Sequence, residues 1–197
     1  MNIRQRMSEI LTAEAAAIAA VDVTSEFERA VLALRDSAGK VLTTGIGKAG
    51  HVARKFASTL CSTGTPAAYM HPAEAAHGDL GLIGPDDCIV AFSTSGKTRE
   101  VIEMIQLGRH IGLKTVIAVT SHPDSELRRL SEIVVDMGVI AEPCPHGLTP
   151  SSSIVVMLAI GDAIALALME LKGFTKHDFG LRHHGGYLGR KARADNE

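Results

Sequence analysis

Hydrophobic positions in the first 36 residues recur at the spacing of an amphipathic helix. Phe27, Val31 and Leu34 fall on one helical stripe. A second stripe is formed by Ile10, Leu11, Ala15 and Ile18. Apolar residues three and four positions apart are typical of a helix that buries one face. The pattern breaks near residues 21–24, so we predict an N-terminal helical segment, residues 1–36, made of two helices.

From residue 37 the pattern changes to short apolar runs that alternate with helical stretches. The apolar runs are 41–44, 67–70, 88–92, 115–119 and 133–135. The helical stretches are 49–62, 98–111, 124–130 and 151–171. Parallel strands buried on both faces and joined by crossover helices produce this alternation. We predict an α/β domain over residues 37–189, with a five-stranded parallel sheet flanked by helices in three layers. Residues 190–197 are predicted to be a loose tail.

Small, hydroxyl-bearing and ionisable residues follow the predicted strands. Ligands of such a sheet bind beyond the carboxyl ends of the strands. Two serine-rich stretches, at 93–98 and 151–153, stand where a helix begins, and helix N-termini offer free N–H groups to a phosphate. Ordinary helix capping is the alternative reading of each stretch. The predicted substrate-binding residues are Gly47, Ser93, Ser95, Thr98, Ser151 and Ser152.

Two glycine-rich strings suggest nucleotide ligands but match their motifs weakly. Gly45-x-Gly47-x-x-Gly50 has the spacing of a dinucleotide fingerprint, yet the second strand ends in Met-His-Pro where that motif needs an acid. Gly96-Lys97-Thr98 ends a string that resembles a nucleoside-triphosphate loop without its first glycine. We therefore expect no nucleotide cofactor and no other cofactor.

Composition narrows the classes of function. The 197 residues are 46% hydrophobic, which suffices for one domain with a full core, and the net charge is −2. Nucleic-acid binders normally carry a basic excess, so we expect no nucleic-acid partner. No uncharged apolar run reaches about 18 residues, so we expect no membrane partner. The three cysteines form no Cys-x-x-Cys pair, which is typical of a reduced, cytoplasmic protein.

Several of these strings together resemble the sugar isomerase (SIS) domain of arabinose-5-phosphate isomerases. They are Gly45-x-Gly47-Lys48-x-Gly50-His51, 62–66, 71–81, Ser93-x-Ser95-Gly96 and Glu142-x-Cys144-Pro145. The resemblance covers roughly residues 10–191. It implies a flavodoxin-like fold, as the apolar pattern does, and interconversion of D-arabinose 5-phosphate and D-ribulose 5-phosphate. Members usually make this conversion for the synthesis of an eight-carbon lipopolysaccharide sugar.

The resemblance also implies the catalytic residues. The functional lysine would be Lys48, the carboxylates Glu100 and Glu142, and the histidines His77 and His183. Aldose–ketose isomerisation through an enediol needs a base between C1 and C2 and a group that offsets the oxyanion. Glu142 is the favoured base because it follows a strand in a proline-bounded loop, with Glu100 as the alternative. Lys48 would offset negative charge, and His183 would open the sugar ring.

The chain departs from the family pattern at positions that bear on substrate and assembly. Lys97 stands where members commonly have Glu, and Ala49 where they usually have Ser. Many members carry two regulatory cystathionine-β-synthase-type domains, and we expect a form without them. The resemblance implies a homotetramer with sites at subunit interfaces. An isomerase of another phosphosugar, such as a hexulose 6-phosphate, and a non-catalytic sugar-phosphate-binding protein remain as alternatives.

Three potential metal ligands are spaced three residues apart. His71, Glu74 and His77 would share one face of a helix and could hold a transition metal there. Enediol chemistry proceeds without a metal, so we expect at most an adventitious site and no metal required for catalysis.

Overall fold

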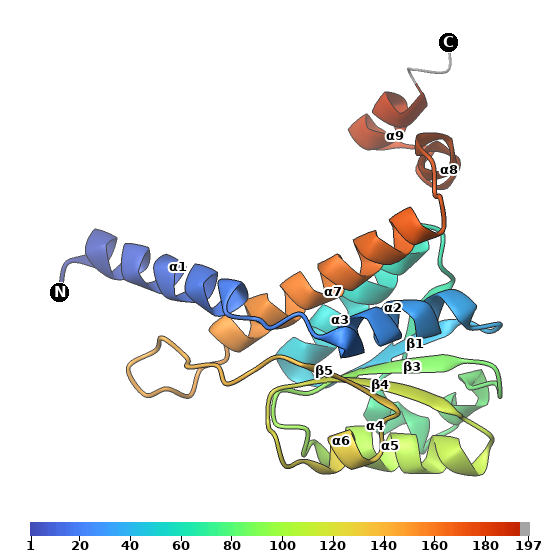
Figure 1. Ribbon diagram of the computed structural model, residues 1–197, viewed down its shortest axis with the longest axis horizontal. Helices are drawn as coiled ribbons and strands as arrows, with labels where there is room; N and C mark the ends of the chain where they lie inside the picture. The colour runs from blue at the N-terminus through green and yellow to red at the C-terminus, as the bar shows by residue number, and fades with distance from the viewer. Residues whose placement is uncertain (194–197) are drawn as a thin grey trace.

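A five-stranded parallel sheet forms the centre of the computed structural model, which describes residues 1–193 (Figure 1). Its strands are β1 (Val41–Thr44), β2 (Ala67–Tyr69), β3 (Cys88–Phe92), β4 (Thr115–Thr120) and β5 (Ile133–Asp136). The strand order is β2-β1-β3-β4-β5, with every neighbouring pair parallel. The direction of winding reverses between β1 and β3, and such a switch point opens a crevice for a ligand. The predicted sheet is confirmed.

Helices cover both faces of the sheet and complete the three layers (Figure 1). One face carries α2 (Ser25–Asp36), α3 (Gly47–Ser62) and α7 (Ser152–Leu171), and the other carries α4 (Pro72–Ala75), the 3-10 turn η1 (Asp79–Leu82), α5 (Arg99–His110) and α6 (Glu126–Arg129). Strand β3 divides its side chains between the two core layers. Val90 and Phe92 pack with α3 and α7, whereas Ile89 and Ala91 pack with α5.

The N-terminal segment forms two helices, as the sequence predicts. Helix α2 buries Phe27, Ala30 and Leu34 against the core. Helix α1 (Ile3–Ala19) has no buried residue and extends away from the body beside the first turns of α7 (Figure 1). The second predicted stripe is therefore largely uncovered in one chain, with Leu11 65% exposed and Ile18 40% exposed.

Helix α7 is long and apolar enough to cross a membrane by length and composition alone. Core helices of water-soluble proteins meet the same two criteria, so this finding is weak evidence for a span. Val156, Ile160 and Ile164 of α7 are buried in the core layer shared with α3. Asp162 forms an ion pair with Lys55 of α3. These contacts are those of a helix that packs on the sheet.

The chain continues beyond α7 as α8 (Lys176–Arg182) and α9 (Gly186–Arg193), which lie past the end of that helix (Figure 1). Thr175 and Asp178 form a reciprocal capping box at the start of α8. The prediction of a loose tail from residue 190 is wrong for residues 190–193, because they are the last turn of α9. Residues 194–197 lie outside the described part of the chain.

Candidate active site

The turn that follows β3 presents the three predicted hydroxyls in a hydrogen-bonded arrangement. The Ser93 and Thr98 hydroxyl oxygens lie 2.9 Å apart, and Ser93 Oγ accepts from the Gly96 amide at 3.1 Å. Ser95 Oγ accepts from the Lys97 amide at 3.2 Å. Gly96 has a φ of +61°, and a Cβ there would lie 2.3 Å from the Ser125 hydroxyl oxygen, so the turn requires glycine. The turn leads directly into α5, whose first amides have no partner within that helix.

A cavity of about 280 Å³ lies at the switch point, above this turn. Lys48, in the first turn of α3, reaches it from the end of β1. Its other lining residues are Ile46, Ala49, Phe92, Ser93, Thr94, Ser95, Thr98, Pro150 and Ile154. The structure thus brings together the predicted lysine, the three hydroxyls of the turn and the start of α7.

Glu142 lies at the N-terminus of α7, partly buried. One carboxylate oxygen accepts hydrogen bonds from the Ser151 amide at 2.8 Å and the Ser151 hydroxyl at 3.1 Å, and the other accepts from the Ser153 amide at 3.2 Å. Burial alone would raise the pKa of Glu142, but hydrogen bonds from Ser153 and Ser151 outweigh it and hold the pKa below its ordinary value. Pro150 and Ile154 flank these serines and line the cavity, so Glu142 is held beside the cavity without being one of its lining residues.

This arrangement bears on the prediction that Ser151 and Ser152 bind phosphate. The helix end expected to attract an anion already holds a carboxylate of this chain, which would repel a second anion. The hydroxyl of Ser152 is buried and has no hydrogen-bond partner within residues 1–193. The stronger candidate for a phosphate is therefore the turn at 93–98. Gly47, with a φ of +61° at the start of α3, leaves open space above its backbone.

The other predicted catalytic residues, Glu100, His77 and His183, do not line this cavity. Glu100 is exposed in the first turn of α5, and His77 is exposed just after α4. His183 ends α8, where its ring stacks on Phe179 at 3.8 Å and its Nδ1 lies 3.0 Å from the Phe179 carbonyl.

Helix α7 separates His183 from the cavity within one chain. It starts at the cavity, runs 20 residues, or about 30 Å, and ends near Thr65, which accepts from Lys172 Nζ at 3.1 Å. Thr65 precedes β2, so α8 and α9 leave from the amino edge of the sheet. His183 therefore lies at the opposite edge from Lys48 and Glu142.

The three potential metal ligands do not share a helical face. Helix α4 is only four residues long, so that His71 is its N-cap, Glu74 lies within it and His77 follows its end. No group of three His, Cys, Asp or Glu side chains among the described residues could hold a metal ion. The expected shared face was wrong because the helix stops before its second turn.

Cys144 and His71 have surroundings that the sequence did not predict. Cys144 Sγ accepts hydrogen bonds from the amides of Leu148 and Thr149, both at 3.2 Å, and these bonds, those from Thr149 foremost, lower its pKa to about 6. His71 has a buried Nδ1 without a partner in the described chain. The amide donors to Cys144 could not be predicted from the sequence, because they depend on how the loop folds. The sequence indicated His71 only as a potential metal ligand and as part of a family-like string.

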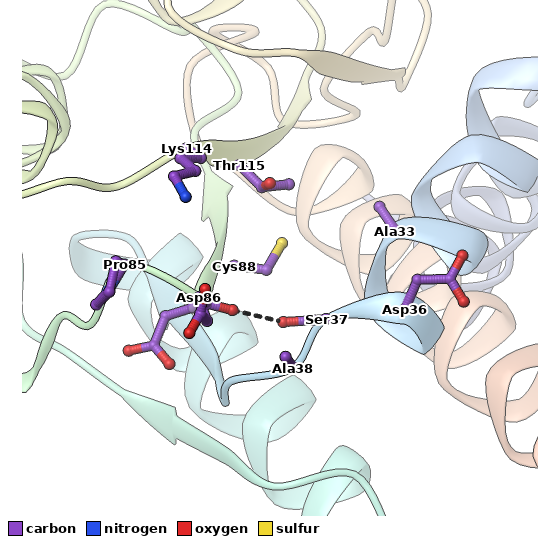
Figure 2. Close-up of a pocket in the computed structure, with 10 residues that line it drawn as sticks. Ala33, Asp36, Ser37, Ala38, Pro85, Asp86, Cys88, Lys114 and Thr115 are labelled. Atoms are coloured by element: carbon purple, nitrogen blue, oxygen red, sulfur yellow. Dashed lines mark hydrogen bonds between the residues drawn. The ribbon is translucent and has the colours of Figure 1, made fainter.

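A second cavity, of about 350 Å³, lies at the amino edge of the sheet (Figure 2). It is lined by the end of α2 and the starts of β3 and β4, with Cys88 and Thr115 among its residues. The hydroxyl of Ser37, which follows α2, donates a hydrogen bond to the Asp86 carbonyl at 3.1 Å (Figure 2). Because ligands of parallel sheets bind at the carboxyl edge, the cavity at the switch point is the candidate active site.

The fold and the turn define a three-layer α/β protein with a cluster of hydroxyls at the carboxyl edge of its sheet, where ligands of such sheets bind. Residues 33–167 match the family model of the SIS domain. The chain therefore belongs to the SIS domain family, and the resemblance noted in the sequence is confirmed.

Relatives with known names match most of this chain. It is 45% identical over 86% of its length to arabinose 5-phosphate isomerase KdsD of Pseudomonas aeruginosa, and 40% identical over 96% to the protein of that name in Escherichia coli K12. The chain spans 52% and 58% of the lengths of these two relatives.

Solved structures agree with this assignment. A protein of Bacteroides fragilis, described as a candidate phosphosugar isomerase involved in capsule formation, superposes with a TM-score of 0.91 at 40% identity, covering 94% of this chain and 100% of that one. A protein of Escherichia coli CFT073 in complex with arabinose 5-phosphate has a TM-score of 0.88 at 39% identity, covering 93% and 100%.

Proposed function

We propose that this protein is an aldose–ketose isomerase that interconverts D-arabinose 5-phosphate and D-ribulose 5-phosphate through an enediol. The observation that carries the proposal is a cavity lined by Lys48 and a hydroxyl-rich turn, with the carboxylate of Glu142 fixed at the start of α7, two of whose flanking residues line the same cavity. The names of the relatives at 40–45% identity and the arabinose 5-phosphate bound in a similar structure support the choice of substrate. The reaction would serve the synthesis of a lipopolysaccharide sugar in the cytoplasm.

The phosphate would bind at the turn after β3. Hydroxyls of Ser93, Ser95 and Thr98 and the first amides of α5 donate hydrogen bonds, and charged acceptors make such bonds strong. Lys48 adds a positive charge on the other side of the cavity. With its phosphate held there, the five-carbon chain extends toward the start of α7 and Glu142.

Glu142 would act as the base. It takes the proton from C2 of the open-chain aldose, and the C1 oxygen gains negative charge as the enediolate forms. A proton passes from the C2 hydroxyl to the C1 oxygen, and the proton held by Glu142 is delivered to C1, which leaves a carbonyl at C2 and gives the ketose. Lys48 offsets the developing negative charge. Glu100 is the alternative base, in the first turn of α5 beside the phosphate turn.

The protein would assemble as a homotetramer in which His183 or His77 completes the site of a neighbouring subunit. Two observations support this arrangement. His183 lies at the edge of the sheet opposite Lys48 in its own chain. An apolar groove of about 760 Å³ between α2 and α7, lined by Phe27, Val31 and Ile164 among others, is open in the single chain. Apolar grooves of this kind are typical of interaction surfaces.

Light scattering and subunit mixing test the assembly. A mass near four times 20.8 kDa is expected, and a monomer would contradict the assembly. Lys48→Ala and His183→Ala chains, each inactive alone, should regain partial activity when mixed, because some sites then receive both intact residues. A tetramer without rescue for any pairing of Lys48 with His77 or His183 would remove the shared site alone.

One coupled assay tests the substrate. The protein is offered arabinose 5-phosphate, ribose 5-phosphate, fructose 6-phosphate and a hexulose 6-phosphate under the same conditions. The proposal predicts the largest kcat/KM for arabinose 5-phosphate. Faster turnover of another phosphosugar would identify an isomerase of that sugar, and binding without turnover of any would identify a sugar-phosphate-binding protein.

A further inference from the structure

Both oxygens of the Glu142 carboxylate are held by the first residues of α7. Ser151 donates to one oxygen through its amide at 2.8 Å and its hydroxyl at 3.1 Å, and the Ser153 amide donates to the other at 3.2 Å. Ser153 belongs to a 20-residue helix whose buried face packs in the core, and Ser151 is the N-cap residue of that helix. The carboxylate is therefore attached to a rigid element, although Glu142 itself belongs to the loop between β5 and α7.

Within residues 1–193, the hydrogen-bond partners of Glu142 are the neutral groups of Ser151 and Ser153, although charged and titratable groups lie nearby. Its own loop carries Cys144 and His146, α3 brings Lys48 to the cavity, and Arg6 of α1 donates to the Pro143 carbonyl. None of them forms an ion pair with Glu142 within the described chain. Burial would raise the pKa of this carboxyl, and donation from Ser153 and Ser151 lowers it below its ordinary value.

We propose that Ser151 is a positioning residue for the isomerisation, whose hydroxyl fixes the Glu142 carboxylate at the start of α7, beside the cavity. The inference rests on the proposed function, in which Glu142 is the base. Ser151 donates to the carboxylate that moves the proton and does not itself contact the substrate phosphate. A base held within a few tenths of an ångström of its working position is a large part of catalysis by orientation.

The acid limb of the pH profile of kcat/KM provides the decisive measurement, because it reports the pKa of the base in the free enzyme. Ser151→Ala removes one donor to the charged form, so the pKa of Glu142 rises and the acid limb moves to higher pH. We expect this shift together with a plateau kcat lowered about tenfold and an unchanged KM. Ser151→Thr keeps the hydroxyl and should restore the wild-type limb.

A merely structural role for Ser151 is separated by a second variant that lowers stability elsewhere. Thr24→Ala removes the side-chain cap of α2, away from the cavity, and should lower thermal stability to a similar extent without moving the limb. If Ser151→Ala folds and its limb and plateau kcat equal those of the wild type, the proposal is overturned. The same holds if Ser151→Thr behaves as Ser151→Ala does, since the hydroxyl would then not be the cause.

A direct titration keeps this test distinct from that of the proposed function. NMR of protein carrying ¹³C-labelled glutamate reads the pKa of Glu142 whether or not the protein turns over any sugar, with Glu142→Gln assigning the signal. We expect a pKa below that of ordinary glutamates in the wild type and a higher one in Ser151→Ala. Lack of turnover by the wild type would reject the proposed function. A pKa of Glu142 that is the same in the wild type and in Ser151→Ala would reject this inference.

Discussion

The two edges of the sheet use polar residues in opposite ways. At the amino edge, Asp87 is only 5% exposed and accepts from the Lys40 amide at 2.9 Å, the Lys40 ammonium at 2.6 Å and the Gly84 amide at 2.7 Å. Burial alone would raise the pKa of Asp87, but the Lys40 ammonium and these amides hold it below its ordinary value. These hydrogen bonds are all made to groups of the same chain. They join the residue before β1, Lys40, to the residue before β3, Asp87.

At the carboxyl edge several polar groups are left without partners. The hydroxyls of Ser152 and Ser125 and the Nδ1 of His71 are buried and unpaired in the described chain. Leaving such groups unpaired costs about 1–3 kcal/mol each, so their retention is typical of a place where a ligand or water completes them. The comparison shows that polar groups at the amino edge are paired within the fold, whereas the carboxyl edge holds unpaired groups and the candidate active site.

The largest expected effect is on turnover at the carboxyl edge. Glu142→Gln keeps the shape of the side chain and removes its basicity, so kcat should fall by roughly 10²–10⁴-fold, with the free energy of unfolding changed by less than about 1 kcal/mol. Steady-state kinetics and urea unfolding measure the two quantities. A variant with wild-type turnover would make Glu142 a loop cap and Glu100 the base.

The converse pattern is expected at the amino edge. Asp87→Asn removes the negative charge to which the Lys40 ammonium and the two amides donate. The free energy of unfolding should therefore fall by about 2–3 kcal/mol, while kcat of the folded variant stays unchanged. Asp86→Asn, at the exposed neighbour, is the control and should change stability by less than about 0.5 kcal/mol.

The pH dependence of this stability follows from the lowered pKa of Asp87. A carboxylate with a depressed pKa contributes stability at pH values above its unfolded pKa, and the contribution disappears as pH falls below about 4. The difference between wild type and Asp87→Asn should therefore close in acid. A difference that is constant from pH 7 to pH 3 would show that the charge of Asp87 is not its source.

Ser95→Ala sharpens the comparison at the phosphate turn. Loss of one hydrogen bond to a charged phosphate, worth about 1.5–3 kcal/mol, should raise KM roughly 10–100-fold with little change in stability. Ser37→Ala deletes a hydroxyl at the amino edge and should leave KM unchanged. If both variants have the same KM as the wild type, the turn at 93–98 does not hold the phosphate.

The smallest effect concerns two cysteines in these contrasting surroundings. The Cys144 pKa of about 6, caused mainly by donation from Thr149, predicts alkylation by iodoacetamide that is half-maximal near pH 6. Burial raises the pKa of Cys88 to about 12, so this thiol should stay unlabelled in the folded protein. Peptide mapping of the label separates the sites. Labelling of Cys144 that rises only above pH 8 would contradict the loop geometry.

Most of the fold could be predicted from the sequence because its signals are local. All five apolar runs are strands within one residue of their predicted ends, and the helical stripe of Phe27 and Leu34 is buried as expected. Helices α8 and α9 were not predicted, because they are only seven and eight residues long and contain glycine and few apolar residues. The same features made residues 190–193 look like a loose tail.

Part of the lining of the candidate site could be predicted, and its geometry could not. The serines at 93–98 and Lys48 meet at one cavity because each follows a strand, which the sequence already indicates. That Glu142 would occupy the N-terminus of α7, in place of a phosphate, depends on how a loop of 15 residues, 137–151, folds back. No spacing rule fixes a loop of that length.

The central claim is that the carboxyl edge of this sheet carries enediol isomerisation of a phosphopentose. The protein is incubated with D-arabinose 5-phosphate in D₂O and followed by ¹H NMR. The account predicts that D-ribulose 5-phosphate appears with deuterium derived from solvent, because a base that removes a carbon-bound proton exchanges it with water before returning it. Glu142→Gln should slow both changes together, and Asp87→Asn should slow neither. Arabinose 5-phosphate that stays unchanged and unlabelled with the folded wild-type protein would contradict the claim.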